Sequence, residues 1–139
     1  MFKIGTDYYF GRIGAPNYTE AVKWFKRAAE AGHELGMMNT AISYLNGEGC
    51  EIDYDLANSY LEKCVELGNA EAMYMLGVSY FNGRGCNVDY TKAAELWQQG
   101  SELGSKNCMN NLAYCFSIGA GVNQKDEKAE YWKAKSEKE

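Results

Sequence analysis

Residues 70–85 read AEAMYMLGVSYFNGRG, and this stretch decides the fold because its pattern recurs along the chain at one fixed spacing. Three series of glycines are each spaced by 36 residues: Gly47, Gly83 and Gly119; Gly49, Gly85 and Gly121; and Gly32, Gly68 and Gly104. Other columns agree without an insertion, among them Tyr8, Tyr44, Tyr80 and Phe116. A fixed period of this length is the signature of a repeat protein.

The third copy shows what one repeat folds into. Ala72, Leu76 and Tyr80 form one apolar stripe of a helix, which the spacing predicts over residues 70–82 after the capping residue Asn69. Glycines at 83 and 85 stop this helix, and Asp89 is placed to begin a second one over about residues 90–103. Each copy is therefore predicted to be a helix hairpin.

Four such copies make up the chain, and they predict an all-α protein of about eight helices. We expect a single α/α solenoid over residues 1–139, with copies at 1–32, 33–68, 69–104 and 105–139. A lone hairpin cannot bury its own apolar stripe, so neighbouring hairpins must stack. The small-residue column Gly5, Ala41, Gly77 and Ala113 predicts a close approach of two helices in every copy.

Composition and charge exclude several other classes of protein. Apolar residues make up 46% and charged residues 24% of 139 residues, which predicts a folded, soluble chain. The net charge of −5 argues against nucleic acid as a partner. No signal peptide and no membrane-inserting segment is recognisable, and we therefore expect a cytoplasmic protein.

The pattern A-x-A-x-x-x-L-G-x-x-Y-x-x-G-x-G of residues 70–85, followed by Asp89, Lys92, Ala93, Trp97 and Gly104, resembles the Sel-one-like repeat (SLR) family of the tetratricopeptide-like superfamily. The resemblance covers the whole chain. Leu76 and Ala93 are 17 residues apart, which matches the longer SLR loop better than an ordinary tetratricopeptide repeat. The resemblance implies a right-handed solenoid that acts as a noncatalytic interaction module or scaffold for a peptide or protein.

The first and last copies depart from the repeat pattern. Ile13 stands where the second loop glycine belongs, and Gly14 is expected to take that role in an altered turn. In the fourth copy, Lys133 and Glu137 replace apolar helix residues, which predicts a polar terminal cap. Phe2 and Ile4 begin in the middle of a helix, so the amino-terminal face is an alternative candidate for self-association.

The five cysteines are predicted to be reduced. Some cysteine-rich SLR proteins bridge positions eight residues apart, as the resemblance implies, but here each matching pair has only one cysteine. Cys64 faces Ala72, and Cys108 faces Gly100. An odd number of cysteines without an export signal is typical of a reducing compartment.

No motif for catalysis, a metal or a cofactor emerges. The chain has one histidine, His33, and no C-x₂-C pair, so neither a metal site nor a cysteine nucleophile is expected. A β-lactam hydrolase, the third alternative, would need Ser-x-x-Lys or Lys-Thr-Gly, and neither occurs. Charges on the second helix of each copy, such as Glu95 and Glu102, are predicted to form a solvated outer face.

The candidate site comprises first-helix positions that the packing stripe leaves free, because tetratricopeptide-like arrays use this concave side. The predicted partner-binding residues are Tyr9, Phe10, Met38, Ile42, Asn46, Tyr74, Val78, Phe81, Asn82, Asn110 and Tyr114. Asn46 and Asn82 would hold the backbone amides of an extended peptide. The alternative is that some of these residues pack the solenoid, above all Met38, Ile42 and Val78.

Overall fold

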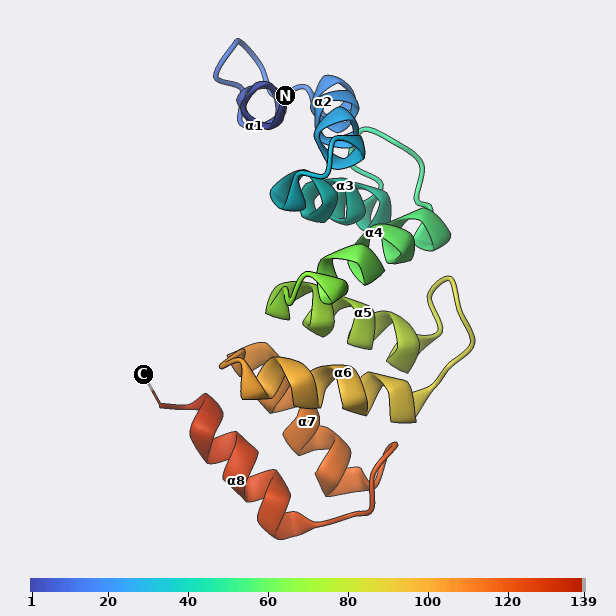
Figure 1. Ribbon diagram of the computed structural model, residues 1–139, viewed down its shortest axis with the longest axis vertical. Coiled ribbons are helices and arrows are strands. Elements are labelled where there is room, and N and C mark those ends of the chain that lie inside the picture. The colour runs from blue at the N-terminus through green and yellow to red at the C-terminus, as the bar shows by residue number, and fades with distance from the viewer. Residues whose placement is uncertain (139) are drawn as a thin grey trace. The chain divides into compact units, whose positions relative to one another are not determined.

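The computed structural model describes residues 1–138, and within them eight α-helices and no strand are present (Figure 1). The helices are α1 (Phe2–Tyr9), α2 (Tyr18–Glu30), α3 (Glu34–Asn46), α4 (Tyr54–Glu66), α5 (Ala70–Asn82), α6 (Tyr90–Glu102), α7 (Lys106–Ile118) and α8 (Asp126–Ser136). The predicted all-α class with about eight helices is confirmed. None of the helices in this range is long and apolar enough to cross a membrane.

Helix ends follow the capping residues that the sequence offers. The side chain of Asn69 accepts the backbone N–H of Ala72 at 2.9 Å, and that of Asp89 accepts the N–H of Lys92 at 3.0 Å. Gly83 ends α5 in the left-handed conformation with φ of 70°, which glycine adopts without a steric penalty. The predicted helix over 70–82 is confirmed, and the second one ends at Glu102, one residue earlier than predicted.

The chain divides into two compact units, Met1–Cys64 and a second one that begins at Val65. In the first unit, α1 packs on α2, and α2 packs on α3. A side chain on Gly5 would come within 2.6 Å of the Phe25 ring, so α1 and α2 can approach this closely only with glycine at position 5. The ring of Phe2 stacks on His33 at 4.9 Å and joins α1 to the start of α3.

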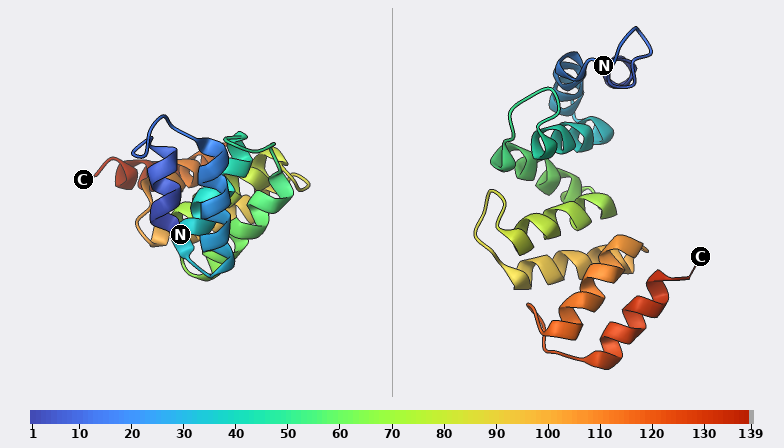
Figure 2. Two further views of the ribbon diagram at one scale, coloured as in Figure 1. Left: turned by 90° about the horizontal axis from the view of Figure 1, so that it is seen from above. Right: turned by 180° about the vertical axis from the view of Figure 1, so that it is seen from behind.

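In the second unit, α5 packs on α6, α6 on α7 and α7 on α8, as Figures 1 and 2 show from different sides. The Trp97 indole of α6 covers Gly77 of α5 so closely that any side chain at position 77 would collide with it. Trp97 Nε1 also donates a hydrogen bond of 3.1 Å to the Tyr74 carbonyl. Cys108 of α7 fills the space beside Gly100 of α6, as the half-pair in the sequence predicts.

The second glycine of two Gly-x-Gly loops, Gly49 and Gly121, lies in close contact with the preceding repeat. A side chain on Gly49 would collide with the backbone of Tyr18 at the start of α2, and one on Gly121 with the backbone of Tyr90 at the start of α6. Ile13 occupies the same column and is 62% exposed. The predicted altered turn is present there, because Gly14 has a φ of 130°.

Candidate functional site

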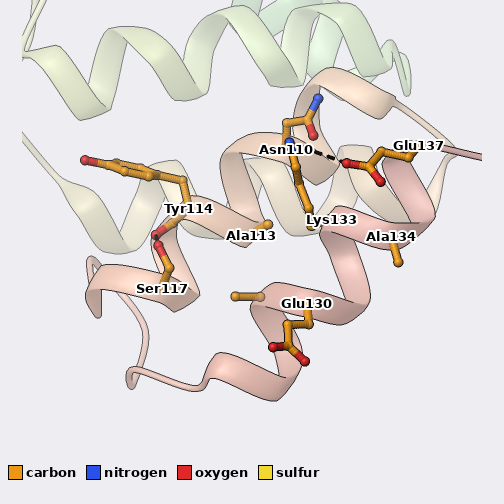
Figure 3. A pocket seen from close by; sticks show the side chains of 9 residues that line it. Asn110, Ala113, Tyr114, Ser117, Glu130, Lys133, Ala134 and Glu137 are labelled. Carbon is orange, nitrogen blue, oxygen red and sulfur yellow. Dashed lines mark hydrogen bonds and ion pairs between the residues drawn. The ribbon is translucent and has the colours of Figure 1, made fainter.

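A pocket of about 550 Å³ lies between α7 and α8 (Figure 3). We call it the α7/α8 groove, and it is lined by Asn110, Ala113, Tyr114 and Ser117 of α7 and by Ala129, Glu130, Lys133 and Ala134 of α8, with Glu137 just beyond α8. Three alanines supply small apolar surface, while charged and hydrogen-bonding side chains contribute the polar part of the lining. Two predicted site residues, Asn110 and Tyr114, are among these residues.

The α7/α8 groove exists because a large apolar side chain is missing from α8. One repeat earlier, the Trp97 indole fills the space above Gly77. The corresponding pair is Ala113 and Lys133, and the Lys133 side chain is 63% exposed. Its Nζ lies 3.8 Å from Glu137 Oε1, and the side chain therefore does not cover Ala113 (Figure 3). The space that an indole would occupy is therefore open.

Hydrogen bonds fix part of the groove wall. Ser136 Oγ donates to Asn110 Oδ1 at 2.7 Å and thereby links the end of α8 to α7. Ser117 Oγ donates to the Tyr114 carbonyl at 2.7 Å. The Tyr114 side chain itself remains 55% exposed, so it presents a large aromatic surface beside the groove. This wall can accept an apolar group and hydrogen-bond to polar atoms around it.

A second, smaller pocket of about 240 Å³ lies in the first unit. It is lined by Thr6, Tyr9, Phe10, Phe25, Asn39, Ile42 and Ser43, which include three predicted site residues. The Tyr9 ring lies 5.0 Å from both Phe10 and Tyr18, measured between ring centroids. The aromatic part of the lining consists of Tyr9 at the end of α1, Phe10 directly after it, and Phe25 of α2.

Glu48 forms hydrogen bonds with residues at and next to this pocket, and no sequence pattern indicated this role. Its carboxylate accepts a hydrogen bond from Tyr9 Oη at 3.0 Å and one from Asn46 Nδ2 at 3.4 Å. The hydrogen bond to Glu48 raises the pKa of Tyr9 above its ordinary value of 10.0, because ionised tyrosine would face a carboxylate. The Asn46 amide, predicted to bind a peptide backbone, is thus already engaged with Glu48.

Several predicted site residues contribute to packing instead. Met38 is only 5% exposed, which favours the packing role over the partner-binding role among the two alternatives given for it above. Tyr74, Val78 and Phe81 are half-buried and pack against the core of the second unit. The Phe81 ring contacts three other rings, with centroids 4.8 Å from Tyr90, 5.6 Å from Trp97 and 6.4 Å from Tyr114. Asn82, at the end of α5, is exposed.

The amino-terminal face of the first unit is less open than the sequence suggested. Phe2 points toward the unit, where it stacks on His33 and lies 5.8 Å from the Phe25 ring. Ile4 is 36% exposed, and Met1 is 52% exposed. Of the two residues named for this face, Ile4 is exposed and Phe2 is half-buried.

The cysteines and the histidine serve the fold. All five thiols are free, and Cys64, Cys108 and Cys115 are buried. Burial raises the pKa of Cys115 to about 11, so its thiol stays protonated and is a poor nucleophile. His33 Nδ1 accepts the backbone N–H of Gly36 and caps α3. Across residues 1–138, no three His, Cys, Asp or Glu side chains are grouped to hold a metal ion.

Comparison with known proteins places these features in a family. The model of the Sel1 repeat matches residues 1–33, 35–69, 70–105 and 106–135. No curated protein matches the chain significantly by sequence. Among solved structures, a protective antigen of uropathogenic Escherichia coli strains that displays an SLR fold has a TM-score of 0.93 at 29% identity, over 97% of this chain and 29% of that one.

Two further structures are similar. A Sel1 repeat protein from Oxalobacter formigenes has a TM-score of 0.93 at 29% identity, over 97% of this chain and 56% of that one. Cysteine rich protein B of Helicobacter pylori has a TM-score of 0.68 at 25% identity, over 87% and 86%. The chain thus spans well under two thirds of the first two relatives, and the predicted solenoid class is confirmed. With four repeats matched along nearly its whole length, the chain belongs to the Sel1 repeat family, whose members are generally noncatalytic protein-interaction modules.

Proposed function

We propose that this chain is a noncatalytic interaction module that binds a segment of a partner protein in the α7/α8 groove. The observation that carries the proposal is the open space above Ala113, which is bordered by the exposed ring of Tyr114. An exposed aromatic beside an apolar depression is the usual anchor of a protein interface. The smaller pocket at Tyr9 and Phe10 is a second contact point for the same class of partner.

The lining favours a partner side chain that is apolar with a polar edge. Ala113, Ala129 and Ala134 offer no hydrogen bonds from their side chains, so they favour an aliphatic or aromatic group. Asn110, Ser117 and Glu130 lie around them and can bind backbone or side-chain donors of the partner. The charged side chains of the lining are two carboxylates and one ammonium group, which argues against nucleic acid as the partner.

The test is partner capture from lysate of the native host with Tyr114→Ala, read by quantitative mass spectrometry. Loss of an aromatic anchor costs about 2 kcal/mol, or roughly 30-fold in affinity, so the main captured protein should be lost. Tyr131→Ala is the matched control, because Tyr131 is 57% exposed on α8 and does not line the groove. Equal capture by both variants would contradict the proposal, provided that both keep the wild-type circular dichroism spectrum.

A further inference from the structure

Tyr9 in the first unit and Phe81 in the second stand in the same column of the repeat, so their surroundings can be compared. Three other rings lie around Phe81, with centroids at 4.8, 5.6 and 6.4 Å: Tyr90, Trp97 and Tyr114. The last of these rings comes from α7, the first helix of the following repeat. In the second unit, the chain itself therefore supplies an aromatic ring on this side of Phe81.

The first unit lacks aromatic volume at the same place. Tyr9 has the equivalent neighbours Tyr18 at 5.0 Å and Phe25 at 6.3 Å. The column of Tyr114, however, holds Ile42, so α3 brings an aliphatic side chain and no ring to this place. Phe25 is also smaller than the tryptophan of its column in the second unit. Both smaller side chains line the smaller pocket of about 240 Å³, which thus lies where the second unit has aromatic rings.

Ser43 adds a buried polar group without a partner to this pocket. Its side chain is 2% exposed and lines the pocket, and within residues 1–138 its hydroxyl forms no hydrogen bond. The same column holds Cys115 in the fourth copy, where a buried thiol behaves as a small apolar group. The half-buried amide of Asn39, which also lines the pocket, has no hydrogen bond to another described residue either. Because a buried polar group without a partner is unfavourable, this lining favours a ligand with a hydrogen-bonding edge.

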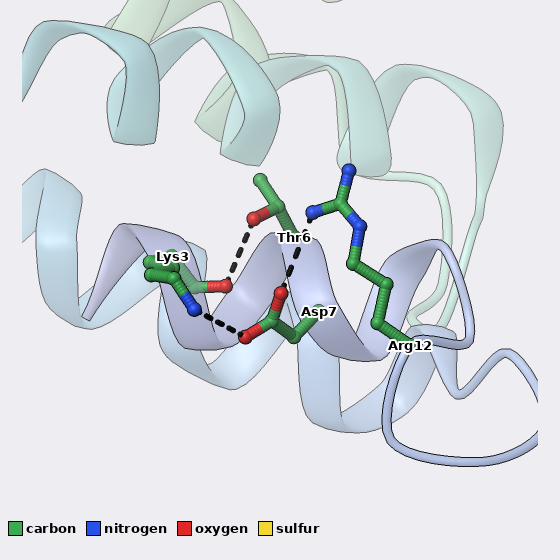
Figure 4. A network of polar contacts seen from close by, with 4 residues as sticks. All are labelled: Lys3, Thr6, Asp7 and Arg12. Carbon is green, nitrogen blue, oxygen red and sulfur yellow. Dashed lines mark hydrogen bonds and ion pairs between the residues drawn. The ribbon is translucent and has the colours of Figure 1, made fainter.

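The pocket favours a ligand without charge. None of the described residues that line it carries a charged side chain. The nearby charges of the first unit are paired, since the Asp7 carboxylate lies 3.2 Å from Lys3 Nζ and 3.4 Å from Arg12 Nη1 (Figure 4). Thr6, a lining residue, donates its hydroxyl proton to the Lys3 carbonyl at 2.8 Å, as the same figure shows. The pocket therefore offers mainly ring faces, one aliphatic side chain and the polar groups of residues 39 and 43.

We propose that the smaller pocket binds an indole-type ring, a neutral fused aromatic whose N–H donates to Ser43 Oγ. A cavity of about 150 Å³ takes one benzene ring, so a pocket of about 240 Å³ has room for a fused bicyclic ring. Tyr9, Phe10 and Phe25 would contact it as aromatic neighbours do elsewhere in proteins. The ring belongs either to a free indole compound or to a tryptophan of a partner protein, and only the second source rests on the proposed function.

An NMR titration of the isotope-labelled full chain with indole tests this inference. Saturable shifts are expected at the backbone amides of Asn39, Ile42 and Ser43. The compound 1-methylindole has the same rings without the N–H donor and should bind several-fold more weakly. Ser43→Ala should weaken the binding of indole several-fold and leave that of 1-methylindole unchanged. No saturable shift at these residues, or equal affinity of the wild type for the two compounds, would overturn the proposal.

Ile42→Tyr tests the place of binding by filling the pocket with a ring of the chain itself. This variant copies Tyr114 of the fourth repeat, so it should abolish indole binding without lowering the melting temperature. Misfolding would not produce that combination. Ile42→Val is the matched control, because it copies Val78 of the third repeat and keeps the pocket open. It should bind indole like the wild type, and wild-type affinity of Ile42→Tyr for indole would contradict the proposed place.

Two further arms identify the source of the ring and separate this inference from the proposed function. N-Acetyltryptophanamide carries the indole on a peptide-like backbone. Tighter binding of this compound than of indole, lost in Asn39→Ala, would indicate a tryptophan of a partner, whereas affinity no higher than that of indole would indicate a free indole compound. Tyr114→Ala removes the anchor proposed for the α7/α8 groove and should bind indole like the wild type. Loss of indole binding in that variant would contradict the inference, while its loss of partner capture concerns the proposed function alone.

Discussion

Gly77 and Trp97 show how a single residue sets the distance between two helices. The indole lies directly on the glycine and donates to the Tyr74 carbonyl at 3.1 Å, so a methyl group at position 77 has no space. We predict that Gly77→Ala lowers the free energy of unfolding by about 1–3 kcal/mol, even though alanine is the better helix former. Urea denaturation followed by circular dichroism measures the change.

The second copy of the repeat supplies the control for this prediction. There the same two columns hold Ala41 and Leu61, and both are fully buried. Trp97→Leu should therefore restore part of the stability that Gly77→Ala removes, because leucine is compatible with alanine at the neighbouring position. If the two losses simply add in the double variant, then the contact between these residues is not what limits the helix distance.

Residue roles with a local cause were predictable from the sequence, and those that depend on distant neighbours were not. Asn69 and Asp89 cap helices through their own third neighbour, so position along the chain was enough to assign them. Glu48 accepts a hydrogen bond from Tyr9, which is 39 residues away in the sequence, and no spacing pattern predicts this pair. Met38 had the apolar character of a binding residue, and its burial depends on the helices around it.

At the scale of the helix, α8 differs from the other second helices through Lys133. We predict that Lys133→Leu raises the melting temperature, because leucine would cover Ala113 and bury apolar area that lysine leaves exposed. The gain should be about 1 kcal/mol, which for a chain of this size corresponds to roughly 3 °C. Differential scanning calorimetry measures the shift.

A lysine elsewhere on the surface distinguishes filling of the groove from a general effect of leucine. Lys106 is exposed at the start of α7 and does not line the groove, so Lys106→Leu should leave the melting temperature within about 1 °C. The Lys133→Leu variant should at the same time lose the partner that the wild type captures. An equal rise in both variants would show that the space above Ala113 is not the cause.

Helices could be predicted nearly to the residue, whereas the α7/α8 groove could not. Glycines such as Gly83 and capping residues such as Asn69 stand at positions that recur every 36 residues. Several copies of the repeat therefore predict the same helix boundary. The groove results from unfilled volume between two helices. The substitution at Lys133 was visible and suggested a polar cap, but its consequence depends on where the lysine side chain turns, namely toward Glu137.

For the whole molecule, the thiols report on how completely the chain is packed. Five cysteines are free, and Cys64, Cys108 and Cys115 are buried while Cys50 and Cys86 are half-buried. We predict that a thiol reagent at pH 8 modifies Cys50 and Cys86 first, since the pKa of Cys115 near 11 and its burial both slow reaction. Mass spectrometry over time gives the order of modification.

The same molecule in denaturant should show all five thiols as reactive, and a reductant should leave its melting temperature unchanged. A count of one free thiol after unfolding would mean two disulfides. It would also contradict the reducing compartment that we propose for this protein, because disulfides persist in oxidising surroundings.

The fold of the whole chain was more predictable than its binding surface because the two have different physical origins. Stacking of hairpins follows from residues that recur in every copy, such as Gly47 and Gly83. A binding surface consists of what stacking leaves uncovered. Val78 and Tyr114 stand in one column, yet Val78 is half-buried against the core and Tyr114 is 55% exposed.

The loop glycines also bear on how such a gene can change in length. Gly49 and Gly121 rest on the backbone of the preceding helix, so a loop that gained or lost a residue would lose this contact. A DNA segment encoding 36 residues can be duplicated or deleted in frame without changing the spacing between a loop glycine and the helix starts of the preceding copy. Unequal crossing-over between neighbouring copies would thus yield longer or shorter arrays that fold, and the number of hairpins becomes a trait on which selection can act directly.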